Sequence, residues 1–343
     1  MDKKSISFLV VGLLLGVVLT SLVFSLSSRS ASNPVGDDQP ERPRIVLKLA
    51  HVLDQGHPVH AALAFMAKRL KEKSHGEVTL KIFPNGQLGS ETESIEQVQR
   101  GVLAMVKTSA AALEGFVPDM AVFGLPYLFR DSDHYWKVLL GDIGRELLDS
   151  GRGVGLKGLC YYDSGSRSFY TRDGPILKPA DLAGKKIRVM RSKTAMDMIS
   201  TLGGAPTPIP WGELYTALQQ GMVDGAENNP PSLLSSRHFE VTKYYSLDEH
   251  TRVPDMVLFS EQIWRSLDPR VQTWIQEAAA ESVTFERELW KKKTDEALKE
   301  LEQNGVTIYR PDKRVFLERV RGMYAPLKGT RLGELVRRIR EVK

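Results

Sequence analysis

The chain has little cysteine and no familiar catalytic motif. Its 343 residues include one cysteine, Cys160, so an internal disulfide is excluded and stability must come from packing. Cys160 lies between Leu159 and Tyr161 in an apolar run, which is typical of a small core residue. Neither the GxSxG pattern of serine hydrolases nor the HExxH pattern of zinc peptidases occurs. The glycine-rich stretch 151–158 lacks the GKS or GKT ending of a phosphate loop, so no candidate catalytic centre remains.

Clustered positive charge is also missing. The formal net charge of +5 comes from 47 Lys and Arg against 42 Asp and Glu, spread along the chain. The basic residues at Lys292–Lys293 and Arg337–Arg340 sit beside acids on predicted helices, as solvated helix faces do. Binding to a phosphate backbone needs clustered cations, so no nucleic-acid partner is expected.

The N-terminus predicts export. Two lysines precede an apolar run from Ile6 to Leu26, and a polar, proline-rich stretch follows. The run is about as long as the ~20 residues that cross a bilayer, so both a cleaved signal peptide and a retained anchor are open. Small serines at its end favour cleavage. We predict a signal peptide or N-terminal anchor over residues 1–30 and a flexible tether over residues 31–43.

Length and pattern together predict an α/β chain with two lobes. Hydrophobic residues make up 42% of 343 residues, and this length exceeds the size at which one core usually stops growing. A strand over 44–52, a helix over Pro58–Lys73 and a strand over 78–84 predict a β-α-β unit and a parallel sheet. The predicted lobe I comprises residues 44–163 with a returning segment, 253–290, and lobe II comprises residues 164–252 with the C-terminal segment 291–343.

One helix is predicted to be unusually long. No glycine or proline interrupts the chain between Pro269 and Asn304, and Gly305 follows as a stop signal. About 35 residues of helix extend about 50 Å at ~1.5 Å per residue, which is longer than one lobe of this size. We therefore expect this helix to lie across both lobes.

Two arginines are candidates for holding a carboxylate. Arg188 lies in a predicted strand between Ile187 and Val189, so its guanidinium shares an inward-packing environment. A guanidinium stays ionised and presents a planar fork of donors that matches a carboxylate. Arg167 follows a glycine-serine pair and precedes another strand. An ion pair with an internal acid is the alternative for each, whereas both side chains in one cleft would suit an acidic ligand.

Four further residues are candidates for the same cleft. Trp211 follows a proline-rich turn and could form a flat wall, although a lone tryptophan is more often a core residue. Asn228 and Asn229 offer amide donors and acceptors, with a turn or a helix cap as the alternative. Glu91 could accept hydrogen bonds from ligand hydroxyls, or it could be an acid favoured by the helix dipole.

Three of the seven histidines, His51, His57 and His60, lie within ten positions. Imidazole is a good zinc ligand, so a metal site must be considered. His57 precedes Pro58, and no further histidine or acid has a clear partner spacing, so no metal is expected. We expect His51 to contact a small molecule instead, because it ends the first strand, where parallel sheets present ligand sites.

The order of several segments resembles the periplasmic solute-binding subunit of TRAP transporters, the DctP-type family. The resemblance covers most of Val46–Leu327 and rests on AHVL, GHP, FPNGQLGSE, RSFYT, GKKIRVMRS, PTPIPWGELYTALQQGMVDGAENNP and the long final helix. It implies a two-lobed periplasmic binding protein fold with a hinge. It also implies a periplasmic, monomeric carrier without enzyme activity or cofactor, which delivers an acid to a membrane permease driven by an ion gradient.

The resemblance also implies roles for single residues. Arg188 matches the family arginine that clamps the ligand carboxylate, and the other matched positions are Arg167, Trp211, Asn228 and Glu91. Here the family motif ENP reads ENNP, so Asn228, Asn229 or both can face the ligand. The segments ENNPPS and YYSLDEHTRVPDMVLFS look similar to members that bind hexuronates such as glucuronate and galacturonate. A C4-dicarboxylate carrier and a membrane-anchored sensory module are the alternatives.

Overall fold

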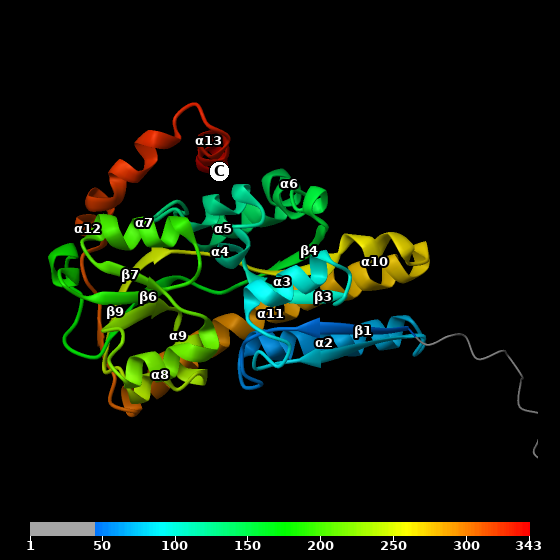
Figure 1. The fold of residues 1–343 in the computed structure, drawn as a ribbon, viewed down its shortest axis with the longest axis horizontal. Helices are drawn as coiled ribbons and strands as arrows, with labels where there is room; N and C mark the ends of the chain where they lie inside the picture. The colour runs from blue at the N-terminus through cyan, green and yellow to red at the C-terminus, as the bar shows by residue number, and fades with distance from the viewer. Residues whose placement is uncertain (1–44) are drawn as a thin grey trace, which may run out of the picture. The chain divides into compact units, whose positions relative to one another are not determined.

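A computed structural model describes residues 45–343 of the chain (Figure 1). The predicted signal peptide or anchor and the tether, residues 1–43, lie outside the described residues. The described residues form two sheets, one with the strand order β2-β1-β3-β10-β4 and one with the order β11-β9-β5-β8-β6-β7. Helices pack on each sheet, which gives one lobe per sheet. The predicted two-lobed α/β fold is therefore confirmed.

The first lobe is built mainly from the N-terminal part of the described chain. β1 pairs in parallel with β2 and β3, whereas β10 returns antiparallel between β3 and β4. The elements of this part are β1 (Ile45–Ala50), α2 (Pro58–Lys73), β2 (Val78–Phe83), α3 (Glu91–Gln99), β3 (Met105–Ser109), α4 (Ala110–Leu113), η1 (Pro118–Gly124), α5 (Ser132–Leu140), α6 (Asp142–Asp149), η2 (Arg152–Val154) and β4 (Leu156–Tyr162).

The second lobe follows in the chain. Its sheet carries a buried apolar cluster on each face, one around Leu214 and Leu218 and one around Ile199 and Leu202. The elements are β5 (Arg167–Thr171), η3 (Pro179–Leu182), β6 (Lys186–Val189), α7 (Lys193–Leu202), β7 (Ala205–Pro208), η4 (Trp211–Glu213), α8 (Leu214–Gln219), β8 (Gly225–Asn228), α9 (Pro230–Ser235), η5 (His238–Glu240) and β9 (Tyr244–Thr251).

The remaining chain passes between both lobes. It comprises β10 (Asp255–Ser260), α10 (Glu261–Ser266), α11 (Pro269–Gln303), β11 (Thr307–Tyr309), α12 (Lys313–Val320), η6 (Arg321–Leu327) and α13 (Arg331–Glu341). α11 has 35 residues, begins at a proline after the N-cap Asp268 and ends before Asn304, as the sequence predicts. It packs on α2 of the first lobe and on α9 of the second (Figure 1). Ile275 belongs to the first core and Leu301 to the second, so this helix joins the lobes.

The last helix corrects one predicted boundary. The sequence predicts that the whole segment 291–343 belongs to the second lobe. α12 does pack there, with Phe316 fully buried. In α13, however, Leu335, Val336 and Ile339 belong to the first core. These apolar residues recur at helical spacing, so the helix must bury this face, and it does so against η1 and α6.

Two short crossings between the sheets form the hinge. One is the segment 163–166 between β4 and β5, and the other is the segment 252–254 between β9 and β10. The hydroxyl of Ser164 donates to the backbone oxygen of Val253 at 2.5 Å, which ties the two crossings together. Gly165 has a φ of 58°, and a Cβ there would lie 3.1 Å from the indole nitrogen of Trp290. Both the positive φ and the close approach of Trp290 therefore favour glycine at this point.

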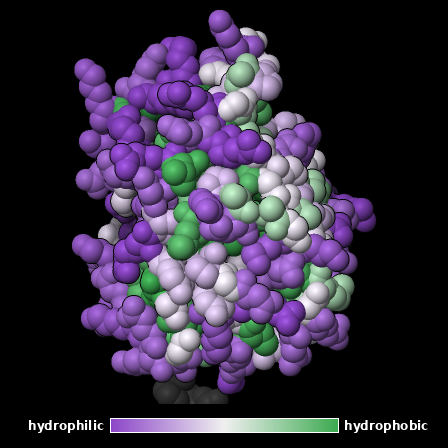
Figure 2. All heavy atoms as spheres, turned by 90° about the vertical axis from the view of Figure 1, so that its left-hand side faces the viewer, coloured by the Kyte–Doolittle hydropathy of each residue, from purple (hydrophilic) through white to green (hydrophobic). Residues whose placement is uncertain are grey.

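Figure 2 shows the face of the molecule formed largely by the second lobe. Hydrophobic residues appear on it as small separate groups among hydrophilic ones. Across residues 45–343, no helix combines the length and the apolar character that crossing a bilayer requires.

Candidate ligand-binding cleft

A narrow cavity lies between the two lobes. Glu91, Lys107 and Asp255 line it from the first lobe, and Arg167, Arg188, Trp211, Asn228 and Asn229 line it from the second. A neighbouring cavity shares Glu91, Arg188 and Trp211 and continues the cleft toward Arg191. The inner cavity measures about 40 Å³, far below the roughly 300 Å³ at which small-molecule pockets begin. The lobes therefore contact each other around the cleft, and a small molecule can enter only when they separate.

Arg188 is a buried cation with unused donors. It lies on β6, and its Nε donates to the backbone oxygen of Ile209 at 2.8 Å. Its guanidinium carbon lies 5.7 Å from the centre of the Trp211 ring, and its Nη1 is buried without a hydrogen-bond partner. No acid among the described residues lies within ion-pair distance of it. Burial lowers the pKa of Arg188, but a guanidinium remains protonated, so this site lacks an anion.

Arg167 differs, because an internal acid already neutralises it. Its Nε and Nη2 donate to the two carboxylate oxygens of Glu227, the latter at 2.9 Å. Nη2 also donates to the backbone oxygen of Glu227 at 2.7 Å, and Nη1 donates to Oδ1 of Asn228 at 2.9 Å. Arg167 lines the cleft as predicted, yet its charge is paired. The sequence leaves two alternatives for each arginine, an internal ion pair or a guanidinium available to a ligand. Arg167 forms the internal ion pair, whereas Arg188 has a guanidinium without an acid partner.

A buried histidine supports the Arg167 pair. Nδ1 of His250 lies 2.8 Å from Asp248, and Nε2 lies 3.5 Å from Glu227. Burial opposes the charge on His250, but Asp248 and Glu227 raise its pKa to about 9. Burial likewise opposes ionisation of Glu227, but Arg167 and His250 lower its pKa to about 2. Two cations and two anions thus form a closed neutral group, which holds the strands behind the cleft together. Sequence reasoning missed all three of Glu227, Asp248 and His250.

The first-lobe side of the cleft carries two acids and a lysine. Oε1 of Glu91 accepts hydrogen bonds from the Ser109 backbone at 2.9 Å and the Thr108 hydroxyl at 3.3 Å. Lys107 and Asp255 form a buried ion pair at 2.7 Å. Burial raises the pKa of Asp255 to about 6 against the effect of Lys107. Sequence reasoning missed this pair, although a single charge within or beside an apolar strand is a usable signal.

Trp211 and the two asparagines of the ENNP motif line the second-lobe side of the cleft. Trp211 forms η4 and lines both cavities. Oδ1 of Asn228 accepts from Arg167 and from the Asn229 backbone, each at 2.9 Å. Oδ1 of Asn229 caps α9 by accepting from the Ser232 backbone at 2.9 Å. Both asparagines line the cavity while their oxygens are occupied, so their NH₂ groups are what they can offer a ligand.

The histidine cluster lies beside the cleft, since Nε2 of His57 is 3.1 Å from the hydroxyl of Ser232, which lines the inner cavity. His51 is not among the residues that line either cavity, and its Nε2 lies 3.0 Å from Nδ1 of His60 on α2. Burial, with the nearby charge of Lys107, lowers the pKa of His51 to about 3. The narrow cavity reaches the neighbouring Val52 and Leu53 and not His51, so the expected contact between His51 and a ligand stays a prediction. His57 caps α2 through the Val59 backbone at 3.2 Å. Over residues 45–343 no group of three or more His, Cys, Asp or Glu could hold a metal ion.

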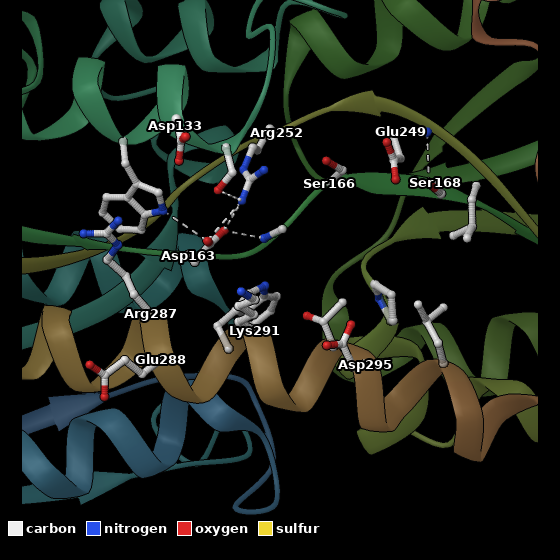
Figure 3. Close-up of a pocket in the computed structure, with 18 of the residues that line it drawn as sticks. Asp133, Asp163, Ser166, Ser168, Glu249, Arg252, Arg287, Glu288, Lys291 and Asp295 are labelled. Atoms are coloured by element: carbon white, nitrogen blue, oxygen red, sulfur yellow. Dashed lines mark hydrogen bonds and ion pairs between the residues drawn. The ribbon is translucent and has the colours of Figure 1, made fainter.

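A larger groove of about 750 Å³ lies on the hinge side (Figure 3). Asp163 at its centre accepts hydrogen bonds from Arg252 at 3.1 Å and from the Trp136 indole at 3.2 Å. Arg287 and Lys291 of α11 also line it. None of the residues predicted for the ligand lies here. Because Arg188 with its unsatisfied donors faces the narrow cleft instead, the cleft is the better candidate site.

A model of the family "Bacterial extracellular solute-binding protein, family 7", the DctP family, matches residues 49–328. The chain belongs to this family. The resemblance inferred from the sequence motifs is thereby confirmed, and this is a family of solute-binding proteins for transport and not of enzymes.

Solved structures of family 7 proteins share the fold. A TRAP periplasmic solute-binding protein from Bradyrhizobium sp. BTAi1, in complex with galacturonate, is 41% identical, with a TM-score of 0.84 over 86% of this chain and 99% of that one. One from Pseudomonas putida F1, with bound D-glucuronate, is 38% identical, with a TM-score of 0.83 over 87% and 98%. The C4-dicarboxylate-binding periplasmic protein DctP of Rhodobacter capsulatus is 30% identical over 87% of this chain and 86% of its own length.

Proposed function

We propose that this family 7 protein captures a hexuronate, such as glucuronate or galacturonate, and delivers it unchanged to a TRAP permease. The observation that carries the proposal is Arg188, a buried guanidinium without an internal acid partner whose free nitrogen lies in the cleft. A bound carboxylate would supply the missing charge and accept two parallel hydrogen bonds. The bound uronates in two similar proteins support this ligand class.

The charges of the cleft favour a hydroxylated monocarboxylate over a diacid. In the inner cavity, the second-lobe side keeps the positive charge of Arg188, because Arg167 and Glu227 neutralise each other. On the first-lobe side, Lys107 cancels Asp255, and Glu91 is left with one negative charge. A carboxylate next to Arg188 therefore places the rest of the ligand near Glu91, which accepts hydrogen bonds from hydroxyls but repels a second carboxylate.

Binding is coupled to closure of the lobes in this proposal. Ligand enters an open cleft and meets Arg188 and Trp211 of the second lobe, and Glu91 of the first lobe then completes its hydrogen bonds. Only the closed form makes both sets of contacts, so ligand shifts the population toward it. Asn228 and Asn229 would donate their NH₂ groups. Arg167 would line the site as a positioned, paired side chain.

The remaining features of the proposal follow from the family. The protein acts in the periplasm as a monomer, has no catalytic activity of its own, and works with permease subunits driven by an ion gradient. An N-terminal anchor would keep it at the membrane. Mass measurement of the mature N-terminus distinguishes cleavage from anchoring, and loss of uptake after gene deletion distinguishes a carrier from a sensory module.

A C4-dicarboxylate is the second candidate, because the DctP protein of Rhodobacter capsulatus is also a relative. A thermal-shift panel of sugar acids and diacids separates the two. A ligand at 100 times its dissociation constant stabilises a protein by about 2.7 kcal/mol, or about 4 °C in a chain of this size. We expect this shift with glucuronate or galacturonate and not with malate or succinate. A shift with the diacids alone would exclude the hexuronate proposal.

A further inference from the structure

We infer that Glu114 is a latch between the lobes, which strengthens the binding of every ligand without touching any of them. The inference rests on the proposed function in that closure must accompany binding. We call the contact of Glu114 with Ser192 and Thr194 the latch. It connects the end of α4 in the first lobe to the start of α7 in the second.

The latch is dense in hydrogen bonds. Oε2 of Glu114 accepts from the Ser192 hydroxyl at 2.5 Å. Oε1 accepts from the Thr194 backbone at 3.1 Å and from the Thr194 hydroxyl at 3.0 Å. Three donors of one lobe thus converge on a single carboxylate of the other. Hydrogen bonds to an ionised acceptor are about twice as strong as neutral ones, so this contact matters for the position of the lobes.

The start of α7 is suited to receive an acid. The helix has ten residues, and the hydroxyl of its N-cap Ser192 already accepts from the Ala195 backbone at 3.0 Å. The first backbone N–H groups of a helix have no partner inside the helix and carry partial positive charge. Glu114 satisfies one of them from outside, at Thr194. An acid of the first lobe therefore completes the capping of a second-lobe helix.

A glycine beside the latch shows that the lobes approach closely here. A Cβ on Gly124 of η1 would lie 3.2 Å from both Cβ and Cγ2 of Thr194. Gly124 does not have a positive φ, so its backbone does not require glycine. The close packing favours glycine instead, because a side chain here would press against Thr194 of α7. This second observation is independent of the hydrogen bonds of Glu114.

The latch lies across the cleft from the hinge. Ser164 of the hinge lines the inner cavity, whereas Ala112 and Arg191, close in sequence to the latch residues, line the outer one. Opening about the hinge would therefore separate the outer rim, where the latch is. The contact exists only in the closed form, and it raises apparent affinity by increasing the fraction of molecules in that form.

The test compares Glu114→Ala with the wild-type protein. Dissociation constants and rates are measured for every acid that binds. We expect the dissociation constant to rise about tenfold, which corresponds to one lost charge-assisted hydrogen bond. The dissociation rate should carry the change, and the factor should be the same for each acid. Gly124→Val should act in the same direction. Glu96→Ala, which removes a partly exposed glutamate of α3 that pairs with Arg100 at the end of the same helix, is the matched control and should change nothing.

A change below twofold, or one that differs between acids, would refute the latch, because a ligand contact alters selectivity whereas a latch does not. Distances between spin labels on the two lobes supply a readout that needs no hexuronate. Without ligand, the closed population should be smaller in Glu114→Ala than in wild type, and equal populations would overturn the inference. If the wild-type protein binds none of the acids, the proposed function fails. The latch is then tested by the spin-label distances alone, which compare the closed population in wild type and in Glu114→Ala.

Discussion

Arg188→Ala should abolish ligand binding while leaving the fold intact. Nη1 and Nη2 are free to donate two hydrogen bonds to a carboxylate, since Nε is already used by Ile209. Each hydrogen bond to a charged group contributes about 1.5–3 kcal/mol, so their loss is worth about 3–6 kcal/mol. At about 1.4 kcal/mol per tenfold change, the dissociation constant should rise by at least about 100-fold. Arg188→Lys should also bind weakly, because an ammonium cannot reproduce the two-pronged contact.

Titration calorimetry with glucuronate and galacturonate measures this loss, and denaturant unfolding measures stability. Arg188 has no acid partner among the described residues, so its removal orphans no charge. Only the hydrogen bond to Ile209 and the contact with Trp211 are lost, and the free energy of unfolding should fall less than in the control variant. Arg167→Ala is the matched control. It strands Glu227, which is 2% exposed, and breaking a buried pair in this way costs about 3–5 kcal/mol of stability. A loss of affinity below tenfold in Arg188→Ala, or an equal loss of stability in both variants, would refute the assigned roles.

Three further outcomes are expected. Glu91→Gln should narrow the preference for sugar acids over C4-dicarboxylates in competition binding, because it removes the repulsion of a second carboxylate; an unchanged ratio would contradict this. His250 has a raised pKa of about 9, so its stabilising effect is complete below its unfolded value near 6.5 and is lost as the pH rises through 9. Unfolding midpoints should therefore fall between pH 6.5 and 9, and His250→Gln should flatten this part of the profile. Gly165→Ala should destabilise the protein and slow closure in stopped-flow binding, because a φ of 58° disfavours a side chain and a methyl group would press on Trp290; wild-type kinetics would exclude this.

Much of the fold follows from local patterns. The observed bounds of α2, Pro58–Lys73, equal the predicted ones, because this helix has clear start and stop signals. The apolar spacing over residues 193–202 and the glycine pair that follows likewise indicate a helix, and α7 spans Lys193–Leu202. The apolar pattern of Val102–Val106 alone indicates a strand, whereas β3 begins three residues later, at Met105. The apolar run begins at Val102, but the backbone N–H groups of Val102 and Leu103 both donate to Gln97 and close the end of α3. An apolar run alone does not distinguish a strand from the turn that precedes it.

β9 is not predicted from the sequence, for a different reason. Its sequence, YYSLDEHT, has no clean alternation of apolar and polar residues, and charged residues usually indicate a loop. Asp248 and His250 are nevertheless fully buried, because each neutralises the other and because Glu227 and Arg167 complete the group. A charged residue usually indicates an exposed position, but here the charges are neutralised by residues that are far apart in the sequence. Only the tertiary structure brings these residues together.

The different fates of the two arginines depend on strand register. Successive side chains of a strand point to opposite faces of a sheet. Phe169 pairs with Glu227 across β5 and β8, so Arg167, two residues before Phe169, shares the face of Glu227. Arg188 pairs with Ala226 on β8 and shares the opposite face, out of reach of that acid. If β8 were shifted by one residue, Glu227 would lie on the face of Arg188 and not on that of Arg167. This register cannot be read from a single sequence. The affinity of the cleft for an anion thus depends on a one-residue offset between strands that are about 40 to 60 positions apart in the chain.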